Sequence, residues 1–385
     1  MGAQKWRRRG RDLCIVGAVT FVLLLVLEII ARGVYLVREG QKAEAVDERA
    51  YSGVYADAPW AEDYFLEFKK AAHTEWHSYV YWRRKPFAGT YINIDEAGVR
   101  KTYTQATNPD SALTVFLYGG STLWGTGARD DYTIPSLLSK RLEQRGYDNL
   151  LIINFGETGY VSTQELIHLQ VELQKGHIPD IVVFYDGVND VFASYQSGEA
   201  GIPQNEFNRH FQFRGEGGRN VAFIDALRQY SALARGVLDT RDRVLPPPTA
   251  PQDLAETLPE ETVQRYLANV EMVKALASTY QYEAFFFWQP TLYAKATPST
   301  EERHLLAAAD SLQKEFFDRT YAVFPPQSEA LERVYTLQTI FDADTNTVFI
   351  DDYHIGERGN QIVADAIADT LVRHSRALNE ARGAW

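Results

Sequence analysis

The stretch Leu113-Thr114-Val115-Phe116-Leu117-Tyr118-Gly119-Gly120-Ser121-Thr122 decides the fold. Its first six residues are mostly apolar and predict a buried strand, and the glycine pair after them predicts a tight exit from that strand. The Ser121 hydroxyl is then expected at the carboxyl end of the strand, where open α/β sheets bind ligands. Taken alone, a Gly-Gly-Ser turn more often marks only a strand exit, and a phosphate loop is disfavoured because no lysine follows the glycines.

Apolar strands and amphipathic helices alternate along much of the remaining chain, which is the order of elements that builds a parallel sheet covered on both faces. The predicted strands are Leu113 to Tyr118, Leu150 to Phe155, Ile181 to Tyr185, Ala284 to Trp288 and Thr347 to Ile350. The predicted helices are Ile134 to Arg145, Thr163 to Gln174, Glu260 to Ser278, Glu301 to Arg319 and Arg358 to Arg373. We therefore expect one α/β catalytic domain over residues 106–378.

Two further strands are followed by residues that suit a binding crevice. The second strand leads into Gly156, whose backbone can approach a ligand closely and offer an unobstructed N–H. The third leads into Asp186-Gly187-Val188-Asn189-Asp190, where the Asn189 amide is expected to face the same crevice. By itself, the glycine is equally typical of a simple turn, and an Asn-Asp pair is usually a turn or a helix cap.

A histidine near the C-terminus completes the set. The strand expected to end at Ile350 is followed by Asp351-Asp352-Tyr353-His354. A histidine three residues after an aspartate can donate one ring N–H to that carboxylate, while its other nitrogen accepts a proton from a serine. This spacing favours Asp351 over Asp352 as the partner of His354. The other seven histidines show no such setting.

These groups all stand at the ends of predicted strands and supply a nucleophile, oxyanion donors, a base and an orienting acid. The conjunction predicts an acyl-transfer site, although each signal alone is weak. The apolar run before Pro290 ends at the same edge, so Trp288 and Gln289 are candidates for lining the pocket. A buried strand with a polar end is an equally good interpretation of those two residues.

The blocks resemble the SGNH, or GDSL-type, hydrolase superfamily, whose four blocks contribute Ser, Gly, Asn and His in that chain order. The resemblance covers roughly Thr114 to Leu371 and implies a flavodoxin-like three-layer α/β/α sandwich with a mostly parallel sheet. It implies that Ser121 attacks the acyl carbon, that His354 takes its proton and that Asp351 orients His354. The oxyanion is then bound by the N–H groups of Ser121 and Gly156 and by the Asn189 side chain.

Gly120 departs from the family pattern, because it stands where the Gly-Asp-Ser form has its aspartate. The Gly-Gly-Ser-Thr block looks like the variant of membrane-anchored members of the superfamily. That aspartate is not one of the four catalytic groups, so the change is expected to leave activity intact.

The N-terminal segment predicts a membrane anchor over residues 13–37. Apolar residues run from Leu13 to Leu27 and resume through Val37, which at about 1.5 Å per residue spans a bilayer core of ~30 Å. Glu28 and Arg32 interrupt the run but can pair at i and i+4. The basic residues before it predict a cytoplasmic tail over residues 1–12: Lys5, Arg7, Arg8, Arg9 and Arg11.

We therefore expect a single-pass protein of the inner (plasma) membrane, with a periplasmic or extracellular catalytic domain. A cleaved signal peptide is the competing interpretation, and it also places the bulk of the chain outside. Residues 38–105 predict a helical stalk and a small β segment. An insertion of about residues 194–256 departs from the strand–helix alternation and is expected to be helical, forming a lid or a wall of the site. Within it, Pro246, Pro247, Pro248 and Pro251 predict a stiff surface link.

The composition of the chain limits which partners and cofactors we expect. A formal net charge of -12 over 385 residues argues against nucleic acid. The single cysteine, Cys14, allows neither a disulfide framework nor a cysteine cluster for zinc. We expect no metal and no cofactor, because the predicted chemistry is complete without either.

Three functions remain open at this point. The first is an esterase that removes acetyl or other short acyl groups from a small molecule or a glycan, such as a cell-envelope or secreted polysaccharide. The second is an O-acyltransferase, since a sugar hydroxyl can replace water in breaking down the same acyl-enzyme. The third is a non-catalytic glycan-binding or envelope-assembly component. The complete Ser, Gly, Asn, Asp and His set argues against the third.

Overall fold

The computed structural model describes residues 2–104, 106, 111–206, 224, 226–244 and 254–383. The chain divides into two compact units. The larger comprises Val46–Glu206 and Ala250–Trp385, and the smaller comprises Met1–Ala45 and Phe207–Thr249. Each unit is described by itself.

The larger unit is built on a five-stranded sheet in the order β6-β5-β7-β8-β9, and all neighbouring strands are parallel. Its strands are β5 (Leu113–Gly119), β6 (Leu150–Asn154), β7 (Ile181–Asp186), β8 (Glu283–Trp288) and β9 (Val334–Thr336). Every residue of β7 and β8 is buried, as expected for inner strands covered on both faces. The predicted parallel sheet is thereby confirmed.

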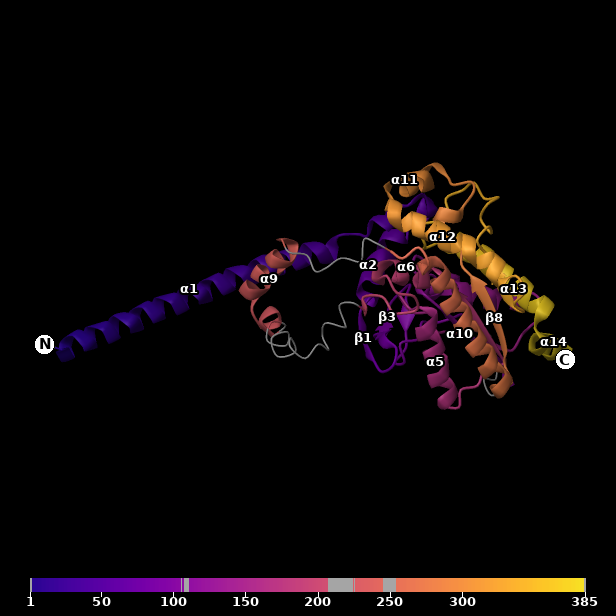
Figure 1. The fold of residues 1–385 in the computed structure, drawn as a ribbon, viewed down its shortest axis with the longest axis horizontal. Helices are drawn as coiled ribbons and strands as arrows, with labels where there is room; N and C mark the ends of the chain where they lie inside the picture. The colour runs from indigo at the N-terminus through magenta and orange to yellow at the C-terminus, as the bar shows by residue number, and fades with distance from the viewer. Residues whose placement is uncertain are drawn as a thin grey trace. The chain divides into compact units, whose positions relative to one another are not determined.

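Helices cover both faces of this sheet (Figure 1). Val115 and Leu117 of β5 join the core on the face of α4 (Ile134–Glu143) and α13 (Glu357–His374). Phe116 and Tyr118, which alternate with them, join the core on the opposite face. That face is covered by three helices: α5 (Ser162–Gln174), α10 (Leu258–Tyr280) and α12 (Ser311–Ser328). The result is the three-layer α/β/α sandwich that the sequence predicts.

Two predicted elements are wrong. Residues Thr347 to Ile350 form no strand but a loop with a single bridge between Phe349 and Ile355. The N–H groups of Val348 and Phe349 donate to Glu302 Oε1 at 2.9 and 3.2 Å, so they are unavailable to a neighbouring strand. The short β9 takes the edge position instead.

The helix predicted from Glu301 to Arg319 is two helices, α11 (Thr300–Ala308) and α12. Asp310 separates them and caps α12 by accepting the N–H of Gln313 at 2.8 Å. Shorter helices complete the unit: α3 (Ser121–Trp124), α6 (Val188–Ser197) and α14 (Arg376–Gly383).

The segment expected to be a stalk belongs, from Val46 onward, to the larger unit. Its helical elements are η1 (Glu48–Tyr51), η2 (Gly53–Tyr55) and α2 (Ala61–Ala71). Two hairpins follow, β1 (Thr74–His77) with β2 (Tyr81–Arg84) and β3 (Phe87–Ala88) with β4 (Asn93–Ile94). Aromatic residues of this segment form a core that also contains Trp124 of α3. The segment therefore packs against the residues that follow Ser121.

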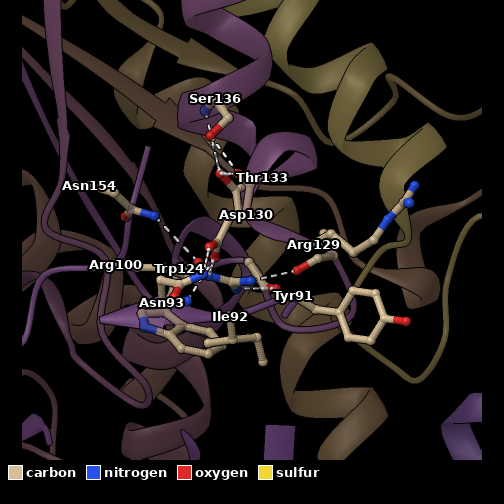
Figure 2. Close-up of polar contacts among 12 residues, drawn as sticks. Tyr91, Ile92, Asn93, Arg100, Trp124, Arg129, Asp130, Thr133, Ser136 and Asn154 are labelled. Atoms are coloured by element: carbon tan, nitrogen blue, oxygen red, sulfur yellow. Dashed lines mark hydrogen bonds and ion pairs between the residues drawn. The ribbon is translucent and has the colours of Figure 1, made fainter. Parts of the chain in front are cut away.

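Arg100 joins this segment to the loop after α3 through hydrogen bonds. Its side chain is buried and donates to Asp130 Oδ1 at 3.0 Å (Figure 2). It also donates to the backbone oxygens of Trp124, Gly125 and Ala128, at 3.1, 2.7 and 2.7 Å. Its guanidinium carbon lies 4.3 Å from the centroid of the Trp124 ring. One buried arginine thus holds the loop that leaves α3.

The smaller unit pairs two helices, α1 (Gly2–Glu44) and α9 (Ala232–Val244) (Figure 1). Residues Gly10–Arg38 are long and apolar enough to cross a membrane, a criterion that an N-terminal signal sequence also meets. The predicted pair is confirmed, because Arg32 Nε donates to Glu28 Oε1 at 2.8 Å.

Glu28 also accepts bonds from the start of α9. They come from the Ser231 hydroxyl and the Ala232 and Leu233 N–H groups, at 2.8, 2.9 and 3.0 Å. A carboxylate within the apolar helix therefore caps the N-terminus of α9. The described part of the predicted insertion is helical here, while Pro246, Pro247, Pro248 and Pro251 lie outside the described residues.

Candidate active site

Ser121 stands at the first position of α3, directly after the carboxyl end of β5. The two glycines before it are closely packed. A Cβ on Gly119 would lie 2.6 Å from the Tyr185 carbonyl oxygen, and one on Gly120 would lie 2.1 Å from Asn189 Nδ2. The Asn189 side chain therefore occupies the space that a side chain at position 120 would need. This packing gives a physical reason for Gly-Gly-Ser in place of Gly-Asp-Ser.

The structure brings Ser121 and His354 into hydrogen-bond contact. Ser121 Oγ and His354 Nε2 are 2.7 Å apart. On the other side of the imidazole, His354 Nδ1 lies 2.7 Å from Asp351 Oδ2 and 2.9 Å from Asp351 Oδ1. This chain of contacts is the geometry in which a histidine can accept a serine proton while an aspartate holds its ring.

Asp351 is held as a carboxylate by its surroundings. Burial by itself raises its pKa, but the charge and hydrogen bond of His354 and the N–H groups of His354 and Tyr353 outweigh it. These N–H groups donate to Asp351 Oδ1 at 2.8 and 3.0 Å. The pKa of Asp351 therefore lies well below its ordinary value. Asp352 points elsewhere, since its Oδ2 accepts the Tyr293 hydroxyl at 3.0 Å.

Asn189 lies in the first turn of α6 and is positioned by a residue that the sequence did not indicate. Its Oδ1 accepts a hydrogen bond from Gln204 Nε2 at 3.4 Å. A Cβ on Gly159 would lie 3.0 Å from Gln204 Oε1, so Gln204 also rests against the loop after Gly156. With its oxygen turned to Gln204, the Asn189 amide directs its NH₂ group towards Gly120.

Gly156 packs against α3, and a Cβ on Gly156 would lie 2.6 Å from the backbone nitrogen of Trp124. Its N–H donates to Asn154 Oδ1 at 3.0 Å. Asn154 Nδ2 in turn donates to the backbone oxygens of Leu123 and Trp124, at 3.3 Å each. The Gly156 N–H thus lies beside α3 but is engaged by a side chain of the protein.

The two candidate pocket residues are both buried. Trp288 is 0% exposed and stacks on Phe324 at a centroid distance of 4.2 Å. It lies beneath Gly187, where a Cβ would meet its ring at 2.7 Å. Gln289 is 3% exposed, and its backbone N–H donates to the backbone oxygen of Asp186. Both are core residues, as the alternative interpretation of the strand end proposed.

The acidic residues Glu165, Asp186 and Asp190 are buried. Burial, with Asp190 nearby, raises the pKa of Asp186 to about 8. Burial also raises the pKa of Glu165 well above its ordinary value and that of Asp190 to about 6. Asp190 accepts the Ser162 hydroxyl at 2.6 Å, which ties α5 to α6. Among the described residues, no group of three or more His, Cys, Asp or Glu side chains could hold a metal ion.

The fold and the site together are those of an ester hydrolase. Residues 117–312, about half of the chain, match the model of the GDSL-like Lipase/Acylhydrolase family. The chain therefore belongs to this family and is an SGNH-type ester hydrolase. The matched residues contain Ser121, Gly156 and Asn189, whereas Asp351 and His354 lie beyond them.

The chain is also similar, at low sequence identity, to solved structures of other proteins. An acetyl xylan esterase, AlAXEase, is 13% identical with a TM-score of 0.41, covering 67% of this chain and 99% of its own. LAE5, an α/β hydrolase from the metagenome of Lake Arreo in Spain, is 14% identical with a TM-score of 0.39, covering 72% and 98%. The lipase Lip_vut3 from a goat rumen metagenome is 12% identical with a TM-score of 0.41, covering 69% and 100%. The comparison with curated proteins finds no match.

Proposed function

We propose that this chain is a membrane-anchored serine esterase that removes acetyl or another short acyl group through an acyl-enzyme on Ser121. The observation that carries the proposal is the contact chain from Ser121 Oγ through His354 to Asp351, at 2.7 and 2.7 Å. His354 Nε2 takes the Ser121 proton as Oγ attacks the acyl carbon. His354 then returns it to the leaving alcohol and later activates water, so that the acid is released and Ser121 is restored.

The oxyanion of each tetrahedral intermediate is bound by the Ser121 N–H and by Asn189 Nδ2. Support comes from the Asn189 side chain, which lies against Gly120 with its oxygen bonded to Gln204. The Gly156 N–H is the third donor in this proposal. It serves that role after leaving Asn154 Oδ1, to which it is bonded in the free enzyme.

Two aromatic residues support a short acyl group. Phe192 stands on α6 one turn after Asn189, and Tyr353 directly precedes His354. Their ring centroids are 6.4 Å apart, so the pair spans the space between the two elements that carry these residues. Tyr353 is fixed in turn by stacking on Phe317 at 5.2 Å. In this proposal the aromatic pair lines the acyl site, which favours acetyl over long acyl chains.

The anchor supports an extracytoplasmic site of action. The helix Gly10–Arg38 is long and apolar enough to span a membrane, and the basic residues precede it. We place the N-terminus in the cytoplasm and the catalytic domain on the outer side. There an acylated glycan of the cell envelope is the kind of substrate such an esterase meets.

The test uses the full chain in detergent micelles with a chromogenic acetyl ester. Ser121→Ala and His354→Ala should each lower kcat by several orders of magnitude while the thermal unfolding temperature stays close to that of the native chain. A serine-reactive phosphonate should label Ser121, as mapped by mass spectrometry. The proposal fails if the native chain turns over no ester, or if Ser121→Ala keeps its activity.

The same assay separates hydrolysis from transfer. Oligosaccharide acceptors are added at constant ester concentration, and both free acetate and acetylated sugar are measured. An esterase releases acetate at a rate that the acceptors do not raise. Acetylated sugar formed at the expense of acetate identifies the acyltransferase instead.

A further inference from the structure

An arginine from the segment that follows α1 reaches the proposed triad. Arg49 lies in η1, only a few residues after the end of α1 at Glu44. Its Nη1 donates to Asp351 Oδ2 at 3.3 Å. This is the same oxygen that lies 2.7 Å from His354 Nδ1, while Oδ1 is occupied by two backbone N–H groups. Asp351 is thus held between its own loop and the N-terminal segment.

The guanidinium of Arg49 is itself fixed in place. Asp47 accepts Nε at 3.0 Å on Oδ1 and Nη2 at 2.8 Å on Oδ2, which is the bidentate arrangement that orients an arginine. Asp47 Oδ1 also accepts the Arg49 backbone N–H at 3.0 Å. The guanidinium carbon lies 5.5 Å from the ring centroids of both Phe65 and Phe68. Because Asp47 holds the guanidinium through Nε and Nη2, Nη1 is oriented towards Asp351.

We propose that Arg49 is a positioning residue for the Ser121 reaction, acting through Asp351; this rests on the proposed function. With its fork held by Asp47, Arg49 places Nη1 on Asp351 Oδ2, the oxygen that also faces His354 Nδ1. The positive charge of Arg49 also interacts with the Asp351 carboxylate. Asp351 therefore stabilises the positively charged imidazole of His354 less strongly than it does without Arg49. The juxtamembrane segment thereby becomes part of the catalytic machinery.

Several charged or titratable groups face Asp351. From the N-terminal segment they are Arg49, Asp47 and Tyr55, and from its own loop they are Asp352 and His354. Arg49 is the cation that the N-terminal segment contributes among them. Removing Arg49 leaves the carboxylates of Asp47, Asp351 and Asp352 without this positive charge from the N-terminal segment.

Two substitutions separate the charge of Arg49 from its shape. Arg49→Met keeps an apolar chain against Phe65 and Phe68 but removes both the fork and the charge. We expect kcat to fall about tenfold with little change in KM. The acid limb of the kcat/KM profile should move to higher pH, because a charged imidazole is then favoured and the neutral base appears only in more alkaline solution.

Arg49→Lys keeps the charge but loses the fork. Its acid limb should stay at the native pH, while kcat lies between those of the native chain and Arg49→Met. A role limited to folding would change the amount of active enzyme but leave the acid limb in place. The shift of the limb, and its rescue by lysine, therefore identify an effect on the triad.

A matched control is available at the amino end of the strands. Arg333 is also partly exposed, at 22% against 24% for Arg49, and its Nη2 donates to Glu283 Oε1 at 2.7 Å. Its guanidinium carbon lies 4.9 Å from the Phe285 ring centroid. Glu283 opens β8, whereas Ser121 follows the carboxyl end of β5. Arg333→Met thus removes a comparable ion pair and stacking contact away from the site.

All variants are assayed as full chains in detergent on the same chromogenic acetyl ester from pH 5 to 9, with Ser121→Ala in the series. The inference is overturned if Arg49→Met matches Arg333→Met in both kcat and the position of the acid limb while Ser121→Ala is inactive. If Ser121→Ala is active, the proposed function has failed, and this inference fails with it.

Discussion

Asn189 and Gly120 are in such close contact that a Cβ on Gly120 would lie 2.1 Å from Asn189 Nδ2. The glycine that departs from the Gly-Asp-Ser pattern is thus the one that admits the Asn189 amide beside the nucleophile. The two positions should therefore be energetically coupled, and that coupling can be measured.

Gly120→Ala should displace the Asn189 amide and lower kcat by about a hundredfold, the usual cost of losing one oxyanion donor. The measurement is a double-mutant cycle on ester hydrolysis with Gly120→Ala, Asn189→Ala and the double variant. The double variant should be no slower than Asn189→Ala. Additive losses would show that Gly120 acts through something other than Asn189.

Gln204 should control which end of the Asn189 amide faces Ser121. Gln204→Glu places a carboxylate where a donor stood, so it should attract Asn189 Nδ2 and lower kcat by about tenfold or more with KM nearly unchanged. Gln204→Met, which only removes the bond, should have a smaller effect. Gln144→Glu, at a surface glutamine bonded to Arg141, is the control. Equal kcat values for Gln204→Glu and Gln144→Glu would contradict this role.

Asp186 should make the larger unit less stable as pH rises. Burial raises its folded pKa from 3.8 to about 8, so the unfolded chain ionises first and gains an advantage that grows between pH 4 and pH 8. Asp186→Asn removes this penalty and should raise Tm by several degrees at pH 8.5 but much less at pH 5. Tm is measured at both pH values, with Asp63→Asn on the exposed face of α2 as control. A gain in Tm that is equal at both pH values would argue against a raised pKa.

Phe192 should limit the length of the acyl group. Phe192→Ala removes half of the aromatic pair with Tyr353 and should raise kcat/KM for a hexanoyl ester relative to an acetyl ester, by about tenfold. Phe192→Leu, which keeps most of the volume, should retain the native preference. The ratio of the two kcat/KM values is the readout, and an unchanged ratio in Phe192→Ala would place the acyl pocket elsewhere.

Much of the fold follows from periodicity, because β5, β6, β7 and β8 are apolar and bounded by turn residues. The edge strand of the sheet was predicted at the wrong residues for a specific reason. Thr347 to Ile350 has an apolar pattern, but Glu302 takes two of its N–H groups, while β9 has only three partly exposed or exposed residues. A carboxylate distant in sequence decided that pairing, and no local pattern reveals it.

The predicted site residues cluster in the structure because the ends of parallel strands share one edge. Ser121 and Asn189 are such residues, and His354 reaches them from a loop. Arg49 and Gln204 lacked any local signal, since one meets Asp351 across 302 positions and the other lies within a predicted insertion. Trp288 had the apolar pattern of a pocket wall but is covered by Gly187, a contact that only the packed sheet determines.

The bond between Glu28 and Ser231 joins positions 203 residues apart, and this has a consequence for biogenesis. The ribosome completes α1 long before it makes α9. In a membrane-anchored chain, the anchor therefore enters the bilayer while Glu28 has only Arg32 as its partner. The remaining hydrogen bonds to Glu28 form only after the chain has been synthesised beyond Leu233. The pairing of α1 with α9 is thus a late event in the synthesis of the chain.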